Sequence, residues 1–347
     1  MTEDRRRKTE NGQRRTGATS VLRHLSSVVC LGAALAIAAA HPAWSQAWPT
    51  RTITAVVPFA AGNAIDVIGR VVLDQLSRQL GQPIVVDNRA GAGGTTGANA
   101  VAKAAPDGHT LLVFSSSFAS AHAIYPNLPY DTFNDFAAVV PLGLQPTVLV
   151  TAPSKGFKTV ADLVAAAKAK PGAMNFASAG IGAASHLAAE RFRVSAGFEA
   201  QHIPHRGPVD ALTAVMTGQV DFYFLPLAPA LPLIQEGKVL ALAVSTAKRA
   251  AALPDVPTTT EAGLPDSAYD FWVGLFVPAK TPRDIVDKLH DETQKTLQVP
   301  AMRERLAKLG YEPMSMTPEE FETYFKADVV ATTKLVKAAK IPTQERN

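Results

Sequence analysis

The chain has 347 residues, enough for two hydrophobic cores, and its 47% apolar and 18% charged residues are typical of a globular protein. Its formal net charge of +4 arises in residues 1–47, because the rest of the chain holds equal numbers of basic and acidic residues. A neutral body gives no reason to expect a nucleic acid partner. The only cysteine, Cys30, also lies in that first segment, which excludes disulfides, cysteine nucleophiles and cysteine metal sites from the remainder.

Residues 1–47 have the pattern of a signal peptide that is removed on export. Basic residues at positions 5–23 precede an apolar run over residues 28–40, and small residues follow at 43–47. The apolar run is too short and too rich in alanine to favour a membrane span. We therefore expect a periplasmic protein whose mature chain begins near Trp48.

The first part of the mature chain alternates between strand-like and helix-like patterns. The predicted elements, in order, are strand 53–59, helix 65–80, strand 83–86, helix 96–104 and strand 110–114. This alternation is typical of a doubly wound α/β sheet with parallel strands. The carboxyl ends of parallel strands meet at one edge of the sheet, where ligands of such folds bind.

A glycine-rich loop follows the second of these strands. Residues 91–97 read GAGGTTG and lead into a helix, whose first turn offers unpaired N–H groups and a partial positive charge. The loop either receives a carboxylate or phosphate, or is a tight strand-to-helix turn without a ligand. A dinucleotide fingerprint does not fit, because residues 87–89 separate the strand from the first glycine and no acid ends the next strand. Small-residue loops also follow strands at 60–63 and 178–185, which favours one shared anion-binding cleft.

The second part of the chain repeats the pattern and then returns. Strands are predicted over 139–142, 147–151, 174–177, 199–203, 220–224, 239–245 and 271–277. Helices are predicted over 160–168, a segment ending at 193, 208–216, 231–236, 282–297, 301–309 and 318–340. The fold class is therefore α/β, with two hinged lobes that are each a doubly wound sheet flanked by helices. Residues 48–147 with 276–347 form the first lobe, and residues 148–275 form the second.

Several polar residues lie at the predicted strand ends and helix starts. Asp66 either interacts with the helix dipole or holds a loop of the cleft. The hydroxyls of Ser115–Ser117 and Ser178 either cap helices or donate to a carboxylate. His205 lies at a strand end, where it could donate to an anion. A metal site with His202 is not favoured, because residues three apart on a strand point to opposite faces.

Catalysis is not favoured either. Ser185 and His186 resemble a nucleophile and its base, but adjacent side chains on a helix diverge by about 100°. No G-x-S-x-G nucleophile elbow occurs in the chain. The residues favour a binding protein without a cofactor, and a periplasmic hydrolase that uses the same cleft stays as an alternative.

Sequence segments spread over the whole mature chain carry a specific resemblance. They are WPTRTI at 48–53, VPF at 57–59, VVDNRAGAGG at 85–94, AKAAPDGHTLL at 102–112, YPNLPYD at 125–131, SAG at 178–180, SHL at 185–187, GQVD at 218–221, LALAVSTAKR at 240–249 and ALPDVPT at 252–258. Together and in this order they resemble the Bug/TctC family, the periplasmic solute receptors of tripartite tricarboxylate transporters.

The resemblance implies a periplasmic binding fold of the Venus flytrap type that closes on a small carboxylate, without catalysis. It implies delivery to membrane permease subunits, or alternatively to a sensor kinase of a two-component system, and we expect a monomer. In this family the loop after the first strand and the Ser-Ala-Gly loop hold the carboxylate. The predicted ligand-binding residues are therefore Phe59, Ala61, Gly62, Asn63, Asp66, Ser115, Ser116, Ser117, Ser178, Ala179, Gly180, Ala184, Ser185 and His205.

Two departures from the family pattern suggest a particular kind of ligand. Ile65 stands where the family usually has a hydroxyl, and Leu225 where it often has a second acid. Both changes would remove polar groups from the pocket. They predict a ligand with less polar surface than citrate, such as an aromatic or short aliphatic carboxylate.

Overall fold

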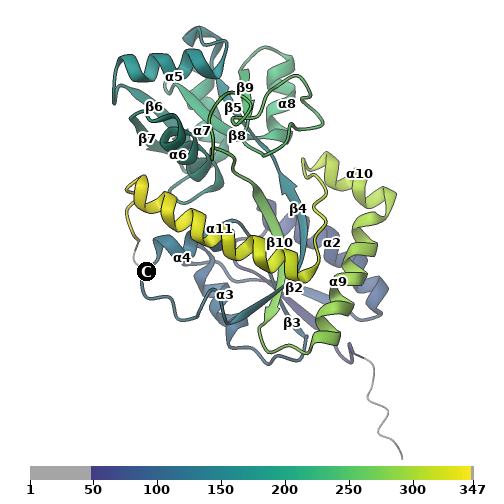
Figure 1. Ribbon diagram of the computed structural model, residues 1–347. Helices are drawn as coiled ribbons and strands as arrows, with labels where there is room; N and C mark the ends of the chain where they lie inside the picture. The colour runs from purple at the N-terminus through teal and green to yellow at the C-terminus, as the bar shows by residue number, and fades with distance from the viewer. Residues whose placement is uncertain (1–47, 345–347) are drawn as a thin grey trace, which may run out of the picture. The chain divides into compact units, whose positions relative to one another are not determined.

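Two five-stranded mixed β-sheets organise the structure (Figure 1). The computed structural model describes residues 48–344, so the predicted signal peptide at 1–47 lies outside the described residues. Both sheets and their helices belong to one compact unit, Pro49–Asn347. Within the described part, no helix combines the length and the apolar character that crossing a membrane requires.

The first sheet has the strand order β2-β1-β3-β10-β4. Its strands are β1 (Ile53–Val57), β2 (Ile84–Asn88), β3 (Thr110–Ser115), β4 (Phe136–Gln145) and β10 (Phe271–Pro278). The first three are parallel, as predicted, whereas β10 runs antiparallel to both β3 and β4. The sheet is therefore mixed rather than purely parallel, because a strand from late in the chain is inserted between two early ones.

Helices from both ends of the described chain accompany the first sheet. They are α2 (Ala64–Leu80), α3 (Thr95–Ala102), α4 (Ser117–Ile124), α9 (Arg283–Gln298), α10 (Pro300–Lys308) and α11 (Pro318–Ala338), with a short 3-10 turn η1 (Ala92–Gly94). Helices α4 and α11 enclose an aromatic core in which Phe114, Phe118 and Trp272 are fully buried. The ring of Phe118 stacks on that of Phe114 with centroids 4.7 Å apart. This core fixes α4, which carries part of the site.

The second sheet has the strand order β7-β6-β8-β5-β9. Its strands are β5 (Thr147–Thr151), β6 (Met174–Ser178), β7 (Ala200–Pro204), β8 (Phe222–Pro226) and β9 (Leu240–Val244). Its helices are α5 (Val160–Ala169), α6 (Ala184–Ala196), α7 (Pro208–Met216) and α8 (Leu227–Gln235), with a 3-10 turn η2 (Pro153–Lys155). The predicted capping box at the start of α5 is present, because the Thr159 hydroxyl accepts the N–H of Asp162 and the Asp162 carboxylate accepts that of Thr159.

The chain passes from one sheet to the other twice. Only Pro146 separates β4 from β5, and residues 245–270 lead back from β9 to β10. Strand β10 pairs with the first sheet over its full length, including residues 271–275, which the sequence patterns assign to the second lobe. The lobe boundaries otherwise stay a prediction.

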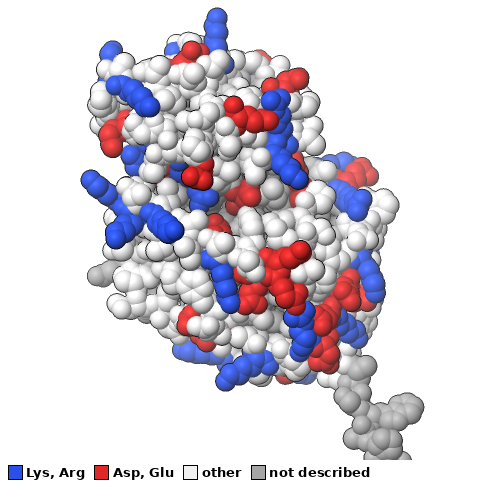
Figure 2. All heavy atoms as spheres, viewed as in Figure 1, with Lys and Arg blue, Asp and Glu red and all other residues white. Residues whose placement is uncertain are grey.

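Charges of both signs lie side by side on the face seen in Figure 2. Ion pairs between described residues include those of Arg283 in α9 with Glu319 in α11 and of Lys326 with Glu322 within α11. Exposed pairs of this kind contribute at most about 1 kcal/mol each. The face therefore carries a mixed charge pattern rather than a single basic field.

Candidate functional site

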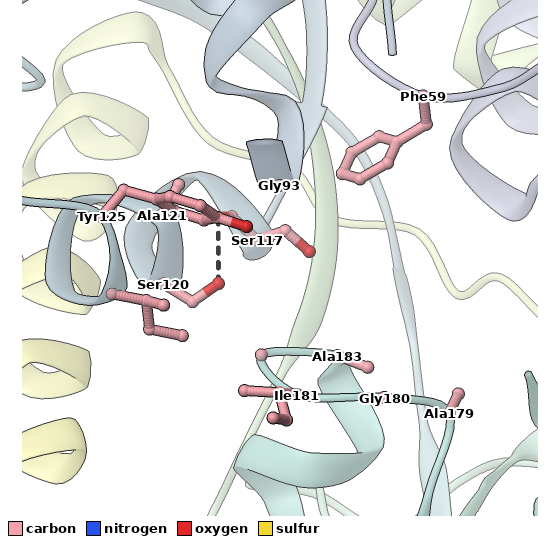
Figure 3. A pocket seen from close by; sticks show the side chains of 12 residues that line it. Phe59, Gly93, Ser117, Ser120, Ala121, Tyr125, Ala179, Gly180, Ile181 and Ala183 are labelled. Atoms are coloured by element: carbon pink, nitrogen blue, oxygen red, sulfur yellow. Dashed lines mark hydrogen bonds between the residues drawn. The ribbon is translucent and has the colours of Figure 1, made fainter. Parts of the chain in front are cut away.

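Loops from both sheets enclose a cavity of about 190 Å³ (Figure 3). The first sheet's side contributes Phe59, Gly93, Ser117, Ser120, Ala121, Ile124 and Tyr125. The loop between β6 and α6 contributes Ala179, Gly180, Ile181, Gly182 and Ala183. Most of these residues follow the carboxyl ends of parallel strands, which is where ligands bind in such sheets.

Asp66 holds the loop that carries Phe59 rather than lining the cavity. Its buried carboxylate accepts the N–H of Gly62 at 2.8 Å and the side-chain amide of Asn88 at 2.8 Å. Asn88 also donates to the carbonyl of Phe59. Burial opposes ionisation, but hydrogen bonds from Arg70, Gly62 and Asn88 hold the pKa of Asp66 below its usual range. An ionised Asp66 therefore fixes the loop after β1.

Asn63 caps helix α2, and this explains the shape of the same loop. Its side-chain oxygen accepts the N–H groups of Ile65 at 2.8 Å and of Asp66 at 3.1 Å. Residues 60–63 are largely exposed, and Phe59 is the residue of this loop that reaches the cavity.

The three serines after β3 have different surroundings. Ser115 accepts the N–H of Ser117 at 3.2 Å, and the hydroxyl of Ser116 lies 3.0 Å from that of Tyr269. The Ser117 side chain instead points into the cavity (Figure 3), and its hydroxyl bonds no other described residue. Ser120, one turn further along α4, donates to the carbonyl of Ser117 at 3.0 Å. Ser117 therefore has the free hydroxyl donor of this wall.

The glycines of the first-sheet loop are explained mostly by close packing. A Cβ on Gly97 would lie 2.7 Å from the Cβ of Pro58, and one on Gly94 would overlap the ring of Phe114. Gly93, with φ +62°, lines the cavity, and a Cβ there would lie 2.6 Å from Tyr125. Of the two interpretations of this loop, tight packing accounts for most of it.

Side-chain oxygens shape the loop of the second sheet. The Ser185 hydroxyl accepts the N–H of Ala179 at 3.0 Å, and the Ser178 hydroxyl accepts that of Gly180 at 3.1 Å. Both serines are buried behind the loop. The N–H of Ile181 bonds no described residue, and neither do those of Ala184 and Ser185, which begin α6. Of these, the Ile181 N–H belongs to a residue that lines the cavity, and it is the donor that this wall can offer directly to an anion.

The two histidines of β7 and its end occupy separate positions. Nε2 of His202 lies 2.5 Å from the Ser178 hydroxyl, beneath the loop. The backbone N–H of His205 donates to the carbonyl of Ser178 at 2.9 Å. Nε2 of His205 is buried, with no hydrogen bond to the described residues, and His205 does not line the cavity.

The predicted site residues are thus placed at different depths. Those that line the cavity are Phe59, Ser117, Ala179 and Gly180. Those that lie beneath or beside its walls are Ala61, Gly62, Asn63, Asp66, Ser115, Ser116, Ser178, Ala184, Ser185 and His205. Sequence reasoning found Ser117 but missed the other lining residues of α4, Ser120, Ala121 and Ile124, because five of that helix's eight residues are buried and no amphipathic pattern marks it.

The ligand polarity argument from Ile65 and Leu225 is not supported by the cavity. Ile65 is 5% exposed. Leu225 is 1% exposed and lies within the second sheet's core. Neither side chain lines the cavity. Both belong to the hydrophobic packing of their sheets.

A family model and several solved structures match most of the chain. The model of the Tripartite tricarboxylate transporter family receptor (TctC) matches residues 68–341. The solved structure of R. palustris Rpa4515 with adipate is 31% identical, with a TM-score of 0.73, over 86% of this chain and 100% of that one. MatC from Rhodopseudomonas palustris with bound malate is 34% identical, with a TM-score of 0.69, over 83% of this chain and 100% of that one.

The periplasmic binding protein BugD is 32% identical, with a TM-score of 0.70, over 86% of this chain and 100% of its own. The matched family is one of receptors rather than enzymes, and these neighbours share the two-lobe α/β fold. The chain therefore belongs to the tripartite tricarboxylate transporter receptor family, TctC, which its sequence segments resemble.

Proposed function

We propose that this protein is a periplasmic receptor that binds a small carboxylate and delivers it to the membrane permease of a tripartite transporter. The cavity between the loops of the two sheets is the observation that carries the proposal. Structures of family members hold adipate and malate, and BugD is described as periplasmic. Delivery to a permease follows from the family alone.

Neutral donors account for carboxylate binding in this cavity. Among the described residues no Lys, Arg or His side chain lines it, so recognition depends on neutral donors, chiefly the Ser117 hydroxyl and the Ile181 N–H, with α6 beginning directly after the lining residue Ala183. Hydrogen bonds to a charged group contribute roughly 1.5–3 kcal/mol each, and the positive end of a helix adds to them. Two or three such bonds are enough for specific binding.

The remaining walls favour a short aliphatic chain between the polar groups. Phe59, Ala121, Ile124 and Ile181 present apolar surface to the same cavity. A linear aliphatic mono- or dicarboxylate offers carbon to this surface and oxygen to the donors. We therefore propose a short aliphatic carboxylate as the ligand class.

Binding between two lobes explains how occupancy is signalled. Ser117 belongs to a helix of the first sheet, and Ile181 belongs to a loop of the second. A carboxylate held by both stabilises the arrangement in which the two loops approach each other. Ligand binding then shifts the population of that arrangement, which a membrane partner can recognise.

The experiment is a thermal-shift and calorimetric screen of the mature protein, residues 48–347, against adipate, malate, citrate, benzoate, an amino acid and a neutral sugar. A ligand at 100 times its Kd stabilises the folded state by about 2.7 kcal/mol, which raises the Tm by a few degrees. A response confined to carboxylates supports the proposal. A response to the sugar alone would overturn it.

A matched pair of variants tests the site itself. Ser117→Ala removes the free donor, so we expect a loss of about tenfold or more in affinity for the best carboxylate. Ser120 lines the same cavity, but its hydroxyl proton is already donated to the Ser117 carbonyl, so we expect Ser120→Ala to change the affinity little. Equal effects of the two substitutions would contradict this placement of the ligand.

A further inference from the structure

A histidine of helix α6 holds the cavity wall through a backbone hydrogen bond. Nδ1 of His186 accepts the N–H of Gly182 at 3.1 Å. Gly182 lines the cavity with φ +77°, a backbone conformation that favours glycine. An imidazole nitrogen that accepts a hydrogen bond carries no proton, so the proton of a neutral His186 lies on Nε2.

A buried carboxylate faces that second nitrogen. Nε2 of His186 lies 3.7 Å from Oε1 of Glu190, and both side chains are less than a tenth exposed. Oε2 of Glu190 accepts two hydrogen bonds from Arg193, at 2.9 and 2.6 Å. Burial opposes the charge of Glu190, but the nearby His186 and the charge and hydrogen bonds of Arg193 hold its pKa below the usual range. An ionised Glu190 therefore attracts the imidazole proton to Nε2 and leaves Nδ1 free to accept.

A second histidine supports the ring of the first. The rings of His186 and His202 stack with centroids 3.9 Å apart and an interplanar angle of 15°. His202 in turn stacks on Phe176 at 5.0 Å, and its Nε2 lies 2.5 Å from the Ser178 hydroxyl at the start of the same loop. The stack therefore contacts the loop at both ends, through Ser178 and through Gly182.

We propose that His186 is a positioning residue for ligand binding, which fixes the loop 179–183 through its Nε2–H tautomer, with Glu190 selecting that tautomer. His186 does not line the cavity and acts only through Gly182. Nδ1 accepts the hydrogen bond from Gly182 and Nε2 faces Glu190, so neither ring nitrogen serves as a base for Ser185. The part that concerns ligand affinity rests on the proposed carboxylate function, whereas the tautomer and the loop contact do not.

Two substitutions separate the two contacts of the ring. In His186→Asn the side-chain oxygen takes the place of Nδ1, so the Gly182 N–H keeps an acceptor while the contact with Glu190 is lost. In His186→Gln the terminal amide takes the place of Nε2, so Glu190 keeps a donor while the Gly182 N–H loses its acceptor. Val194→Ala, at an exposed position of the same helix, is the control.

The first measurement uses the ligand-free protein. Long-range proton–nitrogen NMR correlations of His186 should show the Nε2–H tautomer, and hydrogen exchange at the Gly182 amide should be faster in His186→Gln than in His186→Asn or Val194→Ala. An Nδ1–H tautomer, or equal exchange at Gly182 in all three variants, would overturn the proposal. Tm values establish that each variant is folded.

The second measurement is affinity for adipate and malate. We expect a loss of roughly tenfold in His186→Gln, which corresponds to about 1.4 kcal/mol, and substantially weaker effects in His186→Asn and Val194→Ala. Equal losses in the Gln and Asn variants would contradict a positioning role through Gly182. If the wild type binds no carboxylate while the tautomer and exchange results hold, the proposed function fails and the loop contact stands.

Discussion

The indole Nε1 of Trp272 donates a hydrogen bond to Oδ2 of Asp328 at 2.9 Å. Trp272 belongs to β10 and Asp328 to α11, so this bond ties the long C-terminal helix to the first sheet (Figure 1). Burial, the largest influence, raises the pKa of Asp328 above its usual range, although the hydrogen bond from Trp272 and the charge of Arg191 oppose the rise. The neighbouring Asp270 carboxylate raises it further.

Asp328→Asn should therefore change the pH dependence of stability. A raised pKa means that the folded state holds the proton more tightly than the unfolded state, so the wild type loses stability as pH rises from about 3.8 through the raised pKa. The Asn variant keeps an acceptor for Trp272 and has no charge to bury. In urea unfolding between pH 4 and 7, the unfolding free energy of the variant should increase relative to that of the wild type as pH rises.

Asp255→Asn, at an exposed position, controls for the loss of one negative charge. A constant difference in unfolding free energy between wild type and Asp328→Asn across that range would contradict the burial argument.

Titration of His202 affects stability in the opposite direction, because it destabilises the folded state as pH falls. Burial first, and then the nearby His186, lower the pKa of His202 from 6.5 to about 4. In the unfolded chain His202 is protonated near pH 6.5, whereas in the folded chain it is protonated only near pH 4, so stability is lost as pH falls through that window. The difference between the two pKa values corresponds to roughly 3 kcal/mol of unfolding free energy.

His202→Gln keeps a polar group near the Ser178 hydroxyl and removes the titration. We expect its stability relative to the wild type to improve as pH falls from 6.5 to 4, measured by chemical unfolding at each pH. A relative stability that does not change over this range would contradict the assigned direction.

Two glycines with positive φ should differ sharply in their tolerance of a side chain. Gly62, with φ +83°, has no atom within 4 Å of the position that a Cβ would occupy, so Gly62→Ala has only the backbone cost of about 1–2 kcal/mol. Gly94, with φ +95°, has the Phe114 ring in that position, so Gly94→Ala adds about 1–3 kcal/mol of overpacking. Urea unfolding free energies of the two variants test this, and equal losses would show that the Phe114 ring moves aside.

Local signals in the sequence predicted most elements, because each was set by a few neighbouring residues. Helix α7 has its predicted bounds, Pro208–Met216, since proline is favoured in the first turn of a helix. Helix α4 was missed, because burial on most of its sides removes the amphipathic period. The antiparallel direction of β10 was also missed, because pairing between distant segments leaves no local mark.

In the candidate site too, features set by neighbouring residues could be predicted and features set by distant contacts could not. The loops after β1, β3 and β6 were predicted from strand ends, and each contributes a lining residue: Phe59, Ser117 and Ala179. The depth of each side chain could not be predicted, because it depends on contacts across the fold. For example, the Asp66 carboxylate accepts a hydrogen bond from Gly62 outside the cavity. The Ser116 hydroxyl likewise pairs with that of Tyr269.

The place of β10 between β3 and β4 also sets an order of assembly. During synthesis the first sheet stays incomplete until residues 271–278 have been made, because β3 and β4 pair only with β10 on their facing edges. The second sheet, β5 to β9, is contiguous in the chain and is available for pairing earlier. The half of the protein that is made first is thus the half that finishes folding last, and its open strand edges need protection until then.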